Sequence, residues 1–125
     1  MKRLLVALLL ITLVFSVVFA QGAKENAAKK SGWRIALSND YAGNSWRQTM
    51  ISDFEQAAKI ALDQGLIAEA TVFTTNESSS AEQAAQIQNL ILEGYDAIVL
   101  TAASATALNG AVRQAVDAGI VVVSF

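Results

Sequence analysis

Side chains that could hold a polar ring compound crowd into one short segment, RIALSNDYAGNSWRQTM, which runs from Arg34 to Met50. The candidates are two aromatic and four polar residues: Tyr41, Trp46, Asn39, Asp40, Asn44 and Arg47. The aromatic rings offer flat apolar faces, the amides and the carboxylate offer hydrogen-bond partners, and the guanidinium offers a fixed fork of donors. A pyranose or furanose ring has apolar C–H faces and a polar rim. These residue types therefore suit the binding of a sugar-like ring.

A structural interpretation accounts for the same segment and stays open beside the ligand-binding one. Trp46 begins an apolar helix stripe, so its ring could belong to the packing of that helix. Asn44 or Ser45 could be a plain helix N-cap, because both residue types cap helices well. Asp40 and Arg47 could be solvated. Gly43 suits a turn under either interpretation.

Strand and helix patterns alternate along the chain from Trp33 onward. The expected strands cover residues 33–38, 68–75, 95–102 and 119–125, and the expected helices cover 45–63, 79–93 and 105–118. This alternation is typical of right-handed crossover units. It predicts an α/β fold with a doubly wound, Rossmann-like parallel sheet that has helices on both faces.

Smaller signals agree with this order of elements. Apolar residues recur three or four positions apart in the first helix, at Trp46, Met50, Phe54, Ala57 and Ala61. A glycine follows each helix, at positions 65, 94 and 119, where a left-handed C-terminal cap is expected. The strands at 97–100 and 120–123 are continuously apolar, which predicts burial on both faces.

The first 20 residues, MKRLLVALLLITLVFSVVFA, have the pattern of a secretory signal peptide. Two basic residues precede an apolar run, and small or apolar residues stand before a plausible cleavage site after Ala20. An uncleaved membrane anchor is the alternative, because 17 apolar residues reach the lower limit for a spanning helix. Residues 21–32 are polar and predict a flexible linker. We therefore expect export to the periplasm.

Composition narrows the classes of function. The leader carries two of the nine basic residues, so its removal changes the net charge from −2 to −4, which gives no reason to expect nucleic acid. The chain has neither His nor Cys, so the strongest metal ligands and the usual catalytic triads are absent. It also lacks the GxGxxG, Walker and GxSxG motifs. We predict a protein that is not an enzyme and needs no cofactor.

Ligands of an open parallel sheet bind at the carboxyl ends of its strands, so the loops there complete the candidate surface. The second loop, TTNESSS, is rich in serines that more readily cap the next helix than contact a ligand. The third loop, TAASAT, presents hydroxyls and helix N-terminal amides that can bind a sugar hydroxyl. Ser104 is the candidate there, with a plain N-cap as its alternative. Because the last expected strand reaches Phe125 without a following helix, we expect the chain to be a fragment.

Two stretches resemble the periplasmic sugar-binding proteins of ABC transporters, in the type I group of ribose- and galactose-binding proteins. They are IALSNDYAGNSWRQTMISDFEQAAK and EQAAQIQNLILEGYDAIVLTAASATALNGAVRQAVDAGIVVVSF. The second is the more specific, because it contains the family's pattern Q-x-x-Q-I-x-x-L-I-x-x-G-x-D-A-I. The resemblance covers residues 34–125 and implies that 33–125 form most of the N-terminal lobe of a two-lobed protein.

The resemblance also implies roles for particular residues. In such proteins the residue in the place of Asn44 bonds sugar hydroxyls, and aromatics at the place of Trp46 and the next position sandwich the ring. Here the second position is Arg47, which implies a more polar or differently oriented ligand. The family's acidic third loop is replaced by TAASAT, so carboxylate contacts from that loop are not expected.

The family mechanism implies the partners: a sugar that two lobes close on, and a membrane permease that the closed monomer docks with. With one lobe, we expect very weak solute binding at most. The alternative function is a periplasmic ligand-sensing domain of a signalling or chemotaxis system, which shares the fold. An exported flavodoxin-like enzyme lacks supporting motifs, and repressors of this fold carry a DNA-binding segment where this chain has its leader.

Overall fold

The computed structural model describes residues 32–125, which form a four-stranded parallel sheet with three helices. The strands are β1 (Trp33–Asn39), β2 (Ile67–Thr74), β3 (Ala97–Thr101) and β4 (Val121–Ser124), and the helices are α2 (Ser45–Asp63), α3 (Ser80–Leu92) and α4 (Asn109–Asp117). The predicted doubly wound α/β class is confirmed. The signal peptide predicted at 1–20 and the linker predicted at 21–32, apart from its last residue, lie outside the described residues.

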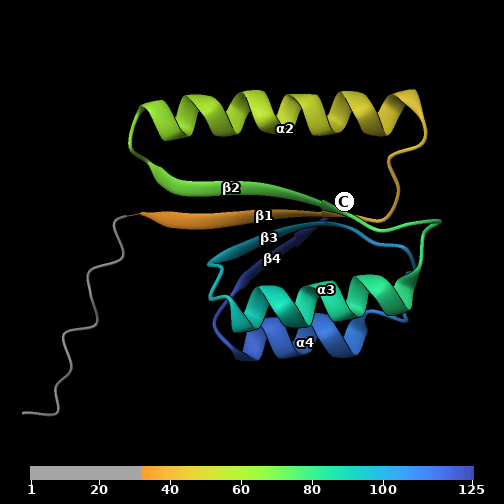
Figure 1. The fold of residues 1–125 in the computed structure, drawn as a ribbon. Coiled ribbons are helices and arrows are strands. Elements are labelled where there is room, and N and C mark those ends of the chain that lie inside the picture. The colour runs from red at the N-terminus through yellow and green to blue at the C-terminus, as the bar shows by residue number, and fades with distance from the viewer. Residues whose placement is uncertain (1–31) are drawn as a thin grey trace, which may run out of the picture. The chain divides into compact units, whose positions relative to one another are not determined.

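The strand order is β2-β1-β3-β4, with every neighbouring pair parallel. Helix α2 covers one face of the sheet, and α3 and α4 lie side by side on the other (Figure 1). The chain adds β2 next to one edge of β1 and then returns past β1 to add β3 next to its other edge. The direction of winding therefore reverses between β1 and β3, and the carboxyl end of that pair is where such sheets bind ligands.

Local capping sets most helix boundaries. Helix α2 begins at Ser45, as predicted, because the Asn44 side chain accepts a hydrogen bond from the Arg47 amide at 2.9 Å. Ser79 caps α3 in the same way through the Glu82 amide at 3.2 Å. The glycines predicted to follow the three helices do have positive φ angles of 69°, 72° and 86°. These residues adopt the left-handed conformation that a helix C-terminus favours.

The start of α4 differs from the prediction. The helix begins at Asn109 and not near residue 105, and residues 105–108 form turns. The Ser104 hydroxyl accepts hydrogen bonds from the amides of Thr106 at 3.4 Å and Ala107 at 3.1 Å. Ser104 therefore caps this preceding turn, and α4 begins after Leu108 without a side-chain cap.

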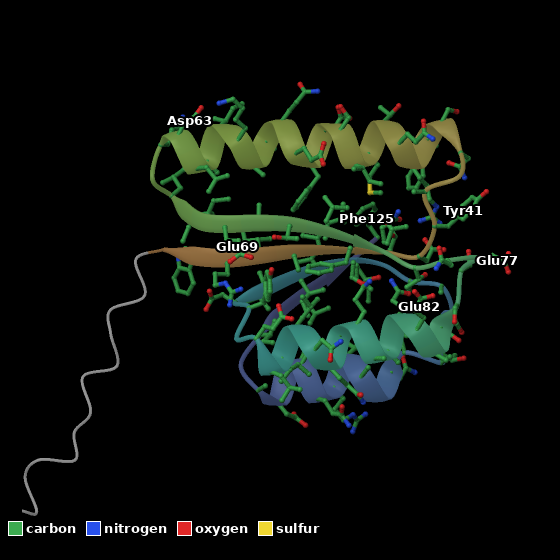
Figure 2. All side chains as sticks on the ribbon, viewed as in Figure 1. Tyr41, Asp63, Glu69, Glu77, Glu82 and Phe125 are labelled. Atoms are coloured by element: carbon green, nitrogen blue, oxygen red, sulfur yellow. The ribbon has the colours of Figure 1, made fainter. Side chains whose placement is uncertain are left out.

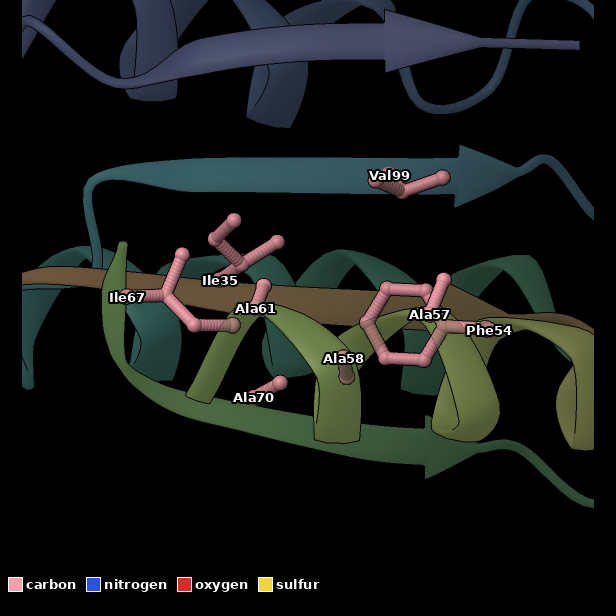
Figure 3. A pocket seen from close by; sticks show the side chains of 8 residues that line it. All are labelled: Ile35, Phe54, Ala57, Ala58, Ala61, Ile67, Ala70 and Val99. Carbon is pink, nitrogen blue, oxygen red and sulfur yellow. The ribbon is translucent and has the colours of Figure 1, made fainter. Parts of the chain in front are cut away.

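The two faces of the sheet are packed differently. Between the sheet and α3 and α4 lies a buried apolar core that includes Ile87, Leu90, Ile98, Leu100 and Ala115. On the other face, α2 has no buried residue. An apolar groove of about 240 Å³ runs between α2 and the sheet, lined by four alanines and four larger apolar side chains: Ala57, Ala58, Ala61, Ala70, Ile35, Phe54, Ile67 and Val99 (Figure 3).

The apolar strand β4 is less covered than its sequence predicts. Val121 is 61% exposed and Val123 is 54% exposed, so the expected burial on both faces is wrong for this strand. Helix α4 packs on β4 from one side, whereas α2 packs on β2 at the opposite edge. Among the described residues, no helix covers β4 on the α2 side.

Candidate ligand-binding site

Asn39 connects three segments at the carboxyl end of the sheet. It is the last residue of β1 and is fully buried. Its Oδ1 accepts hydrogen bonds from Thr101 Oγ1 at 2.7 Å and from Arg47 Nη1 at 2.9 Å. Its Nδ2 donates to the Tyr41 carbonyl at 2.7 Å. One amide thus joins the end of β3, the first loop and the first turn of α2.

Asp40 is also held inside the protein and is only 5% exposed. Its carboxylate forms an ion pair with Arg47, whose Nη2 donates to Oδ2 at 3.2 Å. The Ser78 hydroxyl approaches the same oxygen at 3.4 Å, and the Asp40 carbonyl accepts from Thr75 Oγ1 at 2.7 Å. The charge of Arg47 is therefore neutralised within the chain.

The aromatic side chains of this segment lie outside that polar network. Trp46 is 58% exposed and Tyr41 is 38% exposed. The Arg47 guanidinium lies 5.4 Å from the centroid of the Trp46 ring, within cation–π range. Tyr41 lies at the same end of the sheet as Glu77 and Glu82 (Figure 2). The aromatic surface is thus available at the edge where parallel sheets bind ligands.

The structure brings six of the seven predicted site residues into one cluster: Asn39, Asp40, Tyr41, Asn44, Trp46 and Arg47. Asn44 is exposed, and its Oδ1 is used in capping α2. Ser104 stands apart, on the loop after β3. Within residues 32–125 it forms no hydrogen bond to the other six, and its hydroxyl caps a turn.

Two supporting residues were not predicted from the sequence. Ser78 faces Asp40 from a loop in which Glu77 and Ser78 both have positive φ, at 51° and 57°. Gln83, on α3, is fully buried and bonds to groups on β1 and β3. A signal for Gln83 does exist, because it precedes Ile87 and Leu90 by four and seven positions and so occupies the apolar stripe of its helix.

A second polar cluster lies at the opposite end of the strands, where Figure 2 labels Glu69. Arg34 Nε donates to Glu69 Oε2 at 2.6 Å, and Tyr95 Oη donates to Glu69 Oε1 at 2.6 Å. These bonds, that from Arg34 first, lower the pKa of Glu69 to about 2. Burial, followed by the hydrogen bond to Glu69, raises the pKa of Tyr95.

Neither a metal-binding cluster nor a helix able to span a membrane is found in the part of the chain that the structure describes. Residues 32–125 contain no group of three His, Cys, Asp or Glu side chains placed to hold a metal ion. None of the helices in this range combines the length and hydrophobicity that a bilayer crossing requires.

The sequence matches one protein-family model over residues 35–125, and the model describes a periplasmic binding protein domain. A comparison with curated proteins finds no significant match. The family match covers every strand and helix described above, except the first two residues of β1.

Three solved structures illustrate the likeness. An ABC transporter solute-binding protein from Thermobispora bispora is 50% identical over 73% of this chain, with a TM-score of 0.71. A solute-binding protein from Burkholderia multivorans, with an unknown ligand assigned as α-D-erythrofuranose, is 28% identical over 74%, with a TM-score of 0.64. A sugar ABC transporter protein from Actinomyces odontolyticus is 26% identical over 74%, with a TM-score of 0.66.

The matched region is a minor part of each relative. It spans 29% of the Thermobispora chain, 32% of the Burkholderia chain and 28% of the Actinomyces chain. Within that region the family match, the 50% identity and the strand order all agree with the resemblance predicted from the sequence. The chain therefore belongs to the periplasmic binding protein family.

Proposed function

We propose that this chain provides one wall of a sugar-binding cleft in the solute-binding component of an ABC uptake system. The observation that carries the proposal is the pair of exposed aromatic side chains, Trp46 and Tyr41, beside an internally neutralised polar network at the β1–β3 switch point. The sugar transporter protein from Actinomyces and the furanose assignment in the Burkholderia protein support a sugar as the solute.

The residues divide into those that touch the ligand and those that hold the wall. Arg47 covers one face of the Trp46 ring, so the sugar stacks on the other face. Asn44 turns its Oδ1 toward the helix, which leaves its Nδ2 to donate to a sugar hydroxyl. Tyr41 adds a second aromatic surface, and Ser104 offers a hydroxyl from the neighbouring loop.

Asn39, Asp40 and Arg47 act mainly as supports in this proposal. Their polar atoms are bonded to one another and to β3, so they fix the orientation of Trp46. Arg47 has its charge matched by Asp40, and the nearby Glu77 and Glu82 are acidic. An anionic solute would meet net negative charge at this edge. A neutral sugar is therefore favoured over a sugar acid or sugar phosphate.

The whole protein would act by closing a second wall over the sugar and docking, as a monomer, on a membrane permease. In this proposal residues 1–20 are a signal peptide that is removed on export to the periplasm, 21–32 are a linker, and 33–125 belong to the N-terminal lobe. The relatives are described as ABC transporter proteins, which supports a carrier over a sensor. The family is one of binding proteins, which supports a carrier over an enzyme.

The two tryptophans allow a matched test of the proposed wall. Trp33 begins β1 at the end of the sheet opposite Trp46, and the chain has no third tryptophan. Trp33→Phe leaves Trp46 as the reporter, and Trp46→Phe leaves Trp33. We expect neutral monosaccharides to change the fluorescence of the full-length Trp33→Phe chain saturably, with dissociation constants of about 1 mM or weaker for a single wall.

The same sugars should leave the fluorescence of the Trp46→Phe variant unchanged. Equal responses in the two variants, or no response to any sugar in the Trp33→Phe variant, would count against a sugar site at Trp46. A sugar phosphate that binds more tightly than its parent sugar would overturn the preference for neutral ligands.

A further inference from the structure

Gln83 is a buried polar side chain with a complete set of partners. It lies on α3 with 0% of its surface exposed. Its Oε1 accepts a hydrogen bond from the Ala103 amide at 2.8 Å, and its Nε2 donates to the Thr101 carbonyl at 2.9 Å. The same Nε2 lies 3.2 Å from Ser38 Oγ and 3.3 Å from the Ser38 carbonyl. A single side chain thus joins α3 to β1 and to the loop after β3.

The Gln83 side chain takes the place of a neighbouring parallel strand beside the end of β3. Pairing of β1 with β3 ends at Asn39 and Thr101, so the peptides after Thr101 have no ladder partner there. The Gln83 amide offers one C=O and one N–H to the backbone groups on either side of Ala102. A parallel strand would offer the same two groups, in the same order. Gln83 therefore extends the order of the sheet into the third loop.

This contact reaches the candidate site through Thr101. The Thr101 carbonyl accepts a hydrogen bond from Gln83, and the Thr101 Oγ1 donates to Asn39 Oδ1 at 2.7 Å. Asn39 in turn accepts from Arg47, which lies over Trp46. We propose that Gln83 is a positioning residue for the ligand cleft: it touches no ligand but fixes the wall between β1 and β3. The inference rests on the proposed function for the identity of the ligand. The effect of Gln83 on the loop after β3 can be tested without any ligand.

A purely structural role for Gln83 makes a different prediction. Position 83 lies on the apolar stripe of α3, so methionine, which has similar length and no amide, fits the same space. If Gln83 merely filled the core, Gln83→Met would leave the third loop as ordered as before. If Gln83 positions the cleft, the loop loses its surrogate strand partner while the rest of the sheet stays intact.

Amide hydrogen exchange on the full chain separates these roles. We expect Gln83→Met to speed exchange at Ala103 about tenfold, the loss of one hydrogen bond, with exchange at Ala36 in central β1 changed far less. Gln88→Met is the matched control, because Gln88 is exposed on the same helix. An Ala103 rate that rises no more than the Ala36 rate would overturn the proposal.

A measurement on the wild type keeps the test decisive if the variant fails to fold. The side-chain amide protons of Gln83 should exchange slowly, in contrast to those of Gln88; equal, fast exchange of both would overturn the proposal.

In the Trp33→Phe background, Gln83→Met should also weaken the sugar response several-fold. If Trp33→Phe shows no sugar response, the sugar proposal fails while the exchange result still decides the role of Gln83 in the loop.

Discussion

The two ends of the sheet contain the same three chemical groups but bury different ones. Each end has an arginine paired with a carboxylate and lying over an aromatic ring. Arg34 pairs with Glu69 and lies 4.3 Å from the Tyr95 centroid, whereas Arg47 pairs with Asp40 and lies 5.4 Å from the Trp46 centroid. The two assemblies differ in which part they bury.

At the amino end the aromatic residue is inside, and at the carboxyl end the carboxylate is inside. Tyr95 is 4% exposed and donates its hydroxyl to Glu69. Asp40 is 5% exposed, while Trp46 is 58% exposed. The first arrangement uses its aromatic ring for stability, and the second leaves an aromatic face open to a partner. The proposed ligand site is therefore distinguished from the amino-end cluster by an exposed aromatic ring beside a buried ion pair.

Truncating the two aromatic residues should separate these roles most sharply. Tyr95→Ala removes a buried ring that also meets Phe73 edge to face at 6.1 Å, so we expect a loss of about 3–4 kcal/mol in the free energy of unfolding. Trp46→Ala should change that free energy by only about 0.5 kcal/mol, because the ring is largely exposed. Urea unfolding followed by circular dichroism measures both values. Similar losses in the two variants would contradict the comparison.

Acid should weaken the amino-end cluster in a defined pH range. The pKa of Glu69 is about 2 in the folded protein against an ordinary value of 4.5. A lowered pKa stabilises the folded state above pH 4.5, and that contribution is lost as the pH falls toward 2. Because the side chain is 38% exposed, solvent screening limits the contribution to about 1 kcal/mol.

Unfolding of the wild type and of Glu69→Gln at pH 6 and at pH 2.5 measures this contribution. The wild type should lose about 1 kcal/mol more than Glu69→Gln, which has no charge to lose at that position. Asp63→Asn is a matched control, since Asp63 pairs with Lys59 in an exposed contact. An equal acid loss in wild type and Glu69→Gln would mean that the Arg34–Glu69 pair contributes nothing.

The parts of the fold that depend on neighbours in sequence were predicted well. Helix α2 has the predicted bounds, because the Asn44 cap and the apolar spacing that define it are local. The parallel sheet follows from the alternation of strands and helices. The start of α4 was wrong because a serine can cap a turn as readily as a helix, and the choice at Ser104 depends on the loop geometry after β3.

The clustering of six residues of the candidate site was predictable from the sequence, but the direction of their side chains was not. The other five residues of the cluster lie within eight positions of Asn39, so the predicted strand-to-helix turn is enough to bring them near one another. Asn39 turns inward because Thr101 reaches it from β3, and the Asp40 carboxylate lies inside because Arg47 pairs with it and Ser78 approaches it from the loop after β2. The exposure of β4 likewise depends on which helices cover a face, which no local pattern records.

The smallest expected effect concerns Tyr41, the second aromatic residue at the carboxyl end of the sheet. A Cβ at Gly43 would collide with the phenol end of Tyr41, whose ring lies against this glycine. Gly43→Ala should therefore swing the ring away while changing the free energy of unfolding by only about 0.5 kcal/mol. Ring proton shifts in NMR spectra report the movement, with Tyr95, the other tyrosine, as the internal reference.

Gly110→Ala is the matched control, because nothing lies near the added methyl group and α4 should gain about 0.5–1 kcal/mol from alanine. Unchanged Tyr41 shifts in Gly43→Ala would show that the ring does not rest on the glycine. If Tyr41 moves and the sugar response of Trp46 weakens with it, both aromatic residues serve the ligand. If Tyr41 moves and the sugar response is unchanged, Trp46 alone forms the stacking surface. The carboxyl end of the sheet then depends on one aromatic ring, as the amino end depends on Tyr95.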